Sequence, residues 1–155
     1  MTPPAAHAPR SVPEPDSGEF VARPWGGYQT ISEGPGYKVK RLVVEPGQRL
    51  SLQRHRFRAE SWVVVSGMPR VIVSGRARRV RPREIVTVPT GAWHRIENHG
   101  TQPALIIEVQ HGPYLGEDDI IRRQDDYGRV APDPAASSTR PAARRRGGRV
   151  RARAS

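Results

Sequence analysis

The 155-residue sequence contains no cysteine, which excludes disulfides, thiolate zinc sites and a cysteine nucleophile. Any metal would therefore have to be held by histidine, carboxylate or amide oxygen. No apolar run approaches the roughly 18 residues that a membrane span needs, and residues 1–18 lack the apolar stretch of a signal peptide. We expect no membrane contact and, by default, a cytoplasmic protein.

Aromatic residues are also scarce, at 6%, and acidic residues are outnumbered 15 to 26 by lysine and arginine. The length suits one domain with tails and excludes a multidomain enzyme. Residues 1–18 hold five prolines, and residues 131–155 hold seven arginines against one aspartate. These compositions predict disordered arms on either side of one domain at 19–130. The arginine-rich tail could contact nucleic acid nonspecifically, although a plain compositional bias explains it equally well.

Short β-branched runs alternate with turn signals through the predicted domain. The expected strands are 37–44, 49–53, 61–65, 70–73, 76–80, 85–88, 93–97 and 104–110. Turn signals every 8 to 12 residues or so are typical of a β-sandwich or barrel. Only 117–127 could form a turn or two of helix, and its acidic residues are interpreted as a surface turn. The sequence therefore predicts an all-β fold.

Metal-compatible side chains gather at two places far apart in the sequence. Gln53 and His55 are two residues apart, so they share one face of a strand, and the short link to the next strand can return Glu60 beside them. A tight turn at 89–91 starts a strand that could direct His94 into the barrel. Two hairpins thus offer four ligands for one divalent metal.

Both segments carry spaced motifs. The first runs from Gly47 through the three ligands above to Gly67, and the second consists of Pro89, Gly91, His94 and Asn98. They resemble the paired motifs of the cupin superfamily, although Arg83 stands where a glycine is usual. The resemblance implies a double-stranded β-barrel, or jelly roll, which agrees with the strand pattern.

Further segments narrow the resemblance. Those at 23–26, 36–41, 50–53, 58–60, 62–67, 114–120 and 126–129 are similar to the type II mannose-6-phosphate isomerase domain of the cupin superfamily. This resemblance implies a metal-dependent isomerase of mannose 6-phosphate and fructose 6-phosphate, serving mannose activation and polysaccharide biosynthesis. Zinc is the first choice of metal, and a homodimer is a family-level expectation. A sugar phosphate also needs cations, for which Arg58, Arg129 and Lys40 are the candidates.

The sequence departs from that family in two respects. The domain often ends a longer mannose-1-phosphate guanylyltransferase, for which 155 residues leave no room, so we expect no GDP-mannose synthesis by this chain. Phe57 and Ser61 stand where histidine is common, which supports a non-catalytic sugar-phosphate sensor as an alternative. His55, Glu60 and His94 alone could also form the two-His-one-carboxylate site of an iron oxygenase.

Overall fold

A computed structural model describes residues 18–128 of the chain. Within this range the chain forms eleven strands and one short 3₁₀ helix. Their bounds are β1 Phe20–Arg23, β2 Gly26–Gly34, β3 Tyr37–Val44, β4 Leu52–His55, β5 Ala59–Ser66, β6 Arg70–Val73, β7 Arg76–Arg79, β8 Ile85–Val88, β9 His94–Glu97, β10 Ala104–His111, η1 Glu117–Asp119 and β11 Ile120–Gln124.

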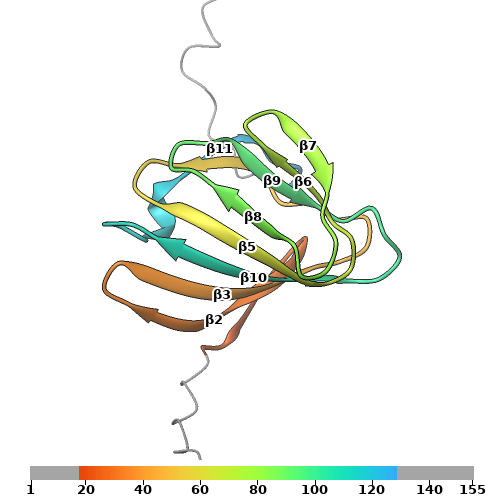
Figure 1. Cartoon of the computed structure of the whole chain (residues 1–155), viewed down its shortest axis with the longest axis horizontal. Helices are drawn as coiled ribbons and strands as arrows, with labels where there is room; N and C mark the ends of the chain where they lie inside the picture. The colour runs from red at the N-terminus through yellow and green to blue at the C-terminus, as the bar shows by residue number, and fades with distance from the viewer. Residues whose placement is uncertain (1–17, 129–155) are drawn as a thin grey trace, which may run out of the picture.

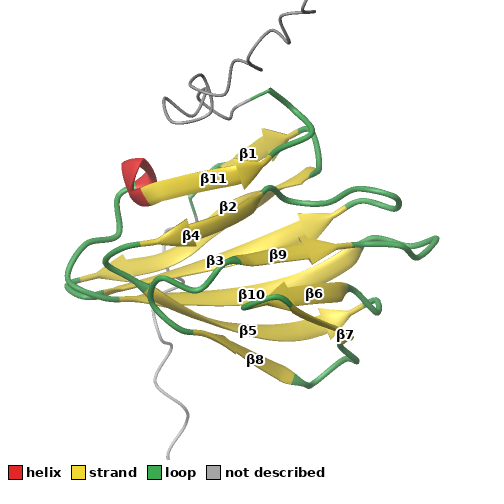
Figure 2. Cartoon of the chain, turned by 90° about the horizontal axis from the view of Figure 1, so that it is seen from above, coloured by secondary structure: helices red, strands yellow, loops and turns green. Residues whose placement is uncertain are grey.

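Two antiparallel sheets face each other and enclose the core (Figure 1). One has the strand order β1-β2-β3-β10-β5-β8 and the other the order β11-β4-β9-β6-β7 (Figure 2). Large apolar side chains from both sheets, among them Leu42, Trp62, Ile96 and Ile106, are buried between them. Burying each such side chain contributes about 1.5–3 kcal/mol. The predicted all-β barrel is confirmed.

The inward faces of β3, β5 and β10 change from apolar to polar along their length. On β10, Ala104 and Ile106 are buried at one end, and Glu108 and Gln110 are buried at the other. The register aligns the neighbouring strands with this change, because Glu108 pairs with Lys40 on β3 and with Trp62 on β5. The barrel therefore has an apolar floor and a polar mouth.

Strands β1 and β2 at the start of the domain were not predicted. Gly26 opens β2 with a positive φ of +133°. A Cβ built on Gly26 would lie 2.1 Å from the carbonyl oxygen of Val43, so the close approach of β2 to β3 requires glycine there.

The helix expected within 117–127 is corrected to a single 3₁₀ turn at Glu117–Asp119. The chain then continues as β11, which pairs with β4. Strand β4 itself begins later than expected, because Arg49 forms only an isolated bridge with Glu97.

Residues 1–17 and 129–155 lie outside the described residues. The predicted disordered arms, the arginine-rich tail and Arg129 therefore fall there entirely or in large part, and they stay predictions. Between residues 18 and 128, no helix is long and apolar enough to cross a membrane.

Candidate metal centre

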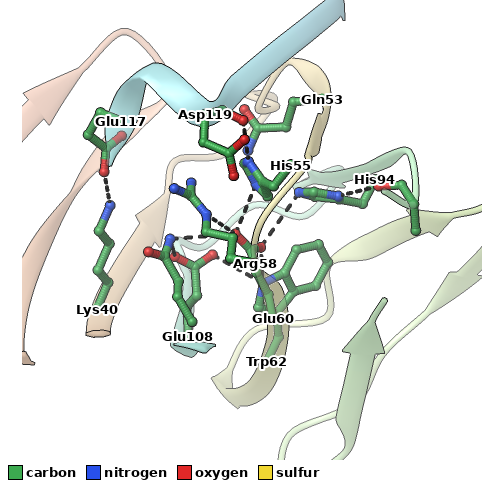
Figure 3. A network of polar contacts seen from close by, with 12 residues as sticks. Lys40, Gln53, His55, Arg58, Glu60, Trp62, His94, Glu108, Glu117 and Asp119 are labelled. Atoms are coloured by element: carbon green, nitrogen blue, oxygen red, sulfur yellow. Dashed lines mark hydrogen bonds and ion pairs between the residues drawn. The ribbon is translucent and has the colours of Figure 1, made fainter. Parts of the chain in front are cut away.

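Three of the four predicted ligands converge in the polar mouth of the barrel (Figure 3). His55 ends β4, Glu60 lies at the start of β5, and His94 begins β9. The Nε2 atom of His55 lies 3.0 Å from Oε1 of Glu60, and Nε2 of His94 lies 3.6 Å from Oε2. One potential ligand atom from each residue lies within 4.8 Å of the others. All three side chains are buried.

The ring nitrogens of the two histidines are arranged as in metal ligands. Nδ1 of His94 lies 2.8 Å from the carbonyl oxygen of Ala92, and Nδ1 of His55 lies 3.3 Å from that of Asp119. With the proton on Nδ1 facing a carbonyl, each Nε2 directs a lone pair toward Glu60. Burial lowers the pKa of His94, against the opposing effect of Glu60, so its neutral form is favoured.

Neither buried Nε2 atom has a hydrogen-bond partner among the described residues. Two lone pairs and a carboxylate facing one another in a buried cluster are unfavourable without a cation between them. Burial raises the pKa of Glu60, but protonation of His55 or His94 and the guanidinium of Arg58 lower it, so the carboxyl of Glu60 is held as an anion. The cluster thus offers an anion and two imidazoles, a donor set that fits a divalent metal.

Gln53 lies beside His55 at the same mouth (Figure 3). It pairs with His94 across β4 and β9, and its Oε1 accepts a hydrogen bond of 3.0 Å from Ser51 Oγ. An amide oxygen has two lone pairs, so one remains for a metal. Gln53 as the fourth ligand stays a prediction.

Sequence reasoning missed a buried polar network behind the cluster. Trp62 Nε1 donates hydrogen bonds of 3.1 Å to both Glu60 Oε2 and Glu108 Oε2. Gln110 Nε2 donates to Glu108 Oε1 at 2.7 Å. Burial, reinforced by the negative charge of Glu60, raises the pKa of Glu108 to about 8, so this carboxyl is largely protonated at neutral pH. In the sequence, Glu108 and Gln110 follow Ile106 at intervals of two residues. This spacing places all three side chains on the inward face of β10.

The structure places two of the three predicted substrate-binding cations in the wall of the same pocket. Arg58 is buried, with Nε 3.5 Å from Glu60 Oε1, and its Nη1 donates to the Gly116 carbonyl at 2.9 Å. Lys40 is also buried and forms an ion pair with Glu117. The third predicted cation, Arg129, lies outside the described residues.

The interpretation of the acidic segment as a surface turn is wrong for Asp119, which is buried. Its Oδ1 accepts the Arg56 N–H at 3.0 Å and its Oδ2 accepts the Phe57 N–H at 3.1 Å. The 3₁₀ turn carries this side chain back over the loop between β4 and β5. Asp119 therefore fixes the loop that connects His55 to Glu60.

The two positions that depart from the resembled family lie outside the cluster. Phe57 is exposed and packs edge-on against Tyr114, with ring centroids 6.2 Å apart. Ser61 stands between Glu60 and Trp62 on β5, so its side chain points to the opposite face of the sheet.

The two-sheet barrel with a buried His-Glu-His cluster in its mouth defines the class of the protein, a cupin. A family model described as "Mannose-6-phosphate isomerase C-terminal" matches residues 14–125. The chain belongs to this family.

Curated relatives share this segment. The chain is 49% identical over 110 residues to mannose-1-phosphate guanylyltransferase ManC of Salmonella typhimurium, covering 71% of this chain and 23% of the relative. It is 47% identical over 115 residues to alginate biosynthesis protein AlgA of Pseudomonas aeruginosa, covering 74% and 24%. The chain thus spans about a quarter of the length of these relatives.

Among solved structures, the chain is similar to the capsular polysaccharide assembling protein CapF of Staphylococcus aureus. The TM-score is 0.62 at 20% identity, over 69% of this chain and 34% of CapF. At this identity the likeness shows the fold alone.

Proposed function

We propose that this domain is a metal-dependent aldose-ketose isomerase that interconverts mannose 6-phosphate and fructose 6-phosphate for mannose activation and polysaccharide biosynthesis. The observation that carries the proposal is the buried cluster of His55, Glu60 and His94 beside a pocket lined by Lys40 and Arg58. The family and the names of its relatives support a mannose phosphate as the substrate.

Aldose-ketose isomerisation moves a proton between C1 and C2 and develops negative charge on the adjacent oxygens. A divalent metal, with zinc the first choice, would act there as a Lewis acid. His55, Glu60 and His94 would hold it, with Gln53 as a fourth ligand. Arg58 adds a fixed positive charge beside Glu60, where burial makes its field stronger than in water.

A group that exchanges the substrate proton is also required. Three carboxyl groups line the pocket, those of Glu60, Glu108 and Glu117. Glu60 faces the histidines and Glu117 is paired with Lys40, which leaves Glu108 as the carboxyl placed to exchange a proton. Trp62 and Gln110 fix its orientation by hydrogen bonds to both oxygens.

The test is a coupled assay of the purified full chain with mannose 6-phosphate. Turnover should disappear with a chelator and return with added zinc. Glu108→Gln should lower kcat by roughly a hundredfold or more, the usual contribution of general acid-base catalysis. Glu33→Gln, which changes an exposed carboxylate paired with Lys38, is the matched control and should leave kcat unchanged.

Two outcomes would contradict the isomerase proposal, and each would favour a different alternative. Binding of metal and of mannose 6-phosphate without turnover would favour the sensor alternative. Oxygen consumption by the iron(II)-loaded chain, without isomerisation, would favour an oxygenase.

A further inference from the structure

Of the pocket cations named so far, Arg58 lies 3.5 Å from Glu60 of the metal cluster. A hexose 6-phosphate carries up to two negative charges on its phosphate group. That group lies at the end of the sugar farthest from C1 and C2. Binding that end calls for additional cations at a distance from the metal cluster.

Arg122 on β11 occupies such a position. It pairs with Gln53 on β4, and Gln53 pairs with His94 on β9, so the three residues form one row across the sheet. Directly paired residues of antiparallel strands share a face, so Arg122 emerges on the same side as Gln53, in the pocket wall. With strands about 4.8 Å apart, its backbone lies roughly 10 Å from that of His94.

Arg23 reaches the same pocket from the edge of the other sheet. It ends β1, and its guanidinium carbon lies 5.3 Å from the centroid of the Tyr28 ring. Its Nη1 donates to the carbonyl of Ala22 at 3.0 Å, but no carboxylate within residues 18–128 lies at ion-pair distance from it. Stacking on Tyr28 orients the guanidinium and leaves further N–H groups for a ligand.

We propose that Arg122 and Arg23 form the phosphate subsite of this pocket, and that they select phosphorylated over neutral hexoses. The inference rests on the proposed function for the identity of the sugar. A guanidinium binds a phosphate through two parallel hydrogen bonds, and two guanidinium groups from facing sheet edges match the double charge of the group.

The test compares binding of mannose 6-phosphate and of unphosphorylated mannose to the metal-loaded full chain by calorimetry. Arg122→Gln should weaken mannose 6-phosphate binding about tenfold or more and leave mannose binding unchanged. Arg23→Gln should also weaken mannose 6-phosphate binding and leave mannose binding unchanged. The matched control is Arg123→Gln, which removes the same charge from the next residue of β11, where the side chain is exposed and does not line the pocket. It should bind both sugars as the wild type does.

The inference is overturned if the wild type shows no preference for mannose 6-phosphate. It is also overturned if Arg122→Gln keeps that preference, or if Arg123→Gln loses it equally. Thermal melting reports the folding of each variant, and Arg122→Lys, which retains the charge but not the paired donors, should fall between wild type and Arg122→Gln. The isomerase assay tests the proposed function, separately from the binding comparison that tests the phosphate subsite. If the chain isomerises, Arg122→Gln should raise KM with little change in kcat.

Discussion

The backbone carbonyl of Asp119 lies 3.3 Å from Nδ1 of His55, although 64 residues separate the two in the sequence. The carboxylate of the same aspartate accepts the backbone N–H groups of Arg56 and Phe57. One residue of the 3₁₀ turn therefore orients an imidazole of the cluster and the loop that follows it.

We expect Asp119→Ala to lower the free energy of unfolding by about 1–3 kcal/mol, because two part-buried backbone N–H groups lose a charged acceptor. Metal affinity should also fall, by roughly 10- to 100-fold, as is usual when the partner of a metal-binding histidine is disturbed. Urea unfolding and zinc titration measure the two effects. Asp118→Ala, at an exposed neighbour that accepts the Tyr114 hydroxyl, is the control. Wild-type metal affinity in Asp119→Ala would contradict this role.

The double variant His55→Ala, His94→Ala should be isolated without metal, because it removes both imidazoles and leaves Glu60 alone. Elemental analysis of the purified protein measures the metal content. His111→Ala, which removes an exposed imidazole at the end of β10, should keep the full complement. A double variant with one metal per chain would rule out this cluster as the site.

Replacing Trp62 by phenylalanine should destabilise the fold by about 1–3 kcal/mol beyond the loss of ring area. The reason is that its single N–H bridges Glu60 and Glu108, and both acceptors are buried. Trp93→Phe is the comparison, since that ring lies under Arg54, with the guanidinium carbon 4.9 Å from its centroid. Equal losses of unfolding free energy in the two variants would show that the indole N–H contributes nothing specific.

Glu97 should make stability depend on pH in the acid range. Burial raises the pKa of this carboxyl, but His99, Arg70 and Arg95 outweigh burial and lower it below its ordinary value. Its stabilisation is therefore complete above the unfolded pKa of about 4.3 and is lost as the pH falls through the folded pKa. Glu97→Gln should be less stable than wild type at pH 7, with the difference shrinking toward pH 3. Urea unfolding at pH 7, 5 and 3 measures it, and a constant difference would contradict the assignment.

Local spacing was sufficient to predict much of the site. A period of two residues places Gln53 and His55 on one face, and the short link between β4 and β5 brings Glu60 beside them. These three residues are close in the sequence, so strand geometry expresses their relation directly. His94 lies far along the chain, and its place beside them depends on the pairing of β9 with β4.

Long-range register was not accessible in the same way. The contact of Trp62 with Glu108 depends on how β5 aligns with β10, and the row from His94 to Arg122 depends on β11 pairing with β4. Strand β11 has only five residues, two of them arginines, and it follows an acidic segment. Its alternation of apolar and polar residues is too short to distinguish a strand from a helical turn. Tertiary pairing, and not local preference, decided its structure.

The change from an apolar floor to a polar mouth along β3, β5 and β10 separates two kinds of constraint within single strands. Substitutions near Val44, Val64 and Ile106 act on the cohesion of the barrel, whereas those near Lys40, Glu60 and Glu108 act on what it holds. In a chain built in this way, substitution of a few residues at the polar mouth can change which ligand the barrel binds. The apolar floor is unchanged by such substitutions and continues to provide the free energy of folding.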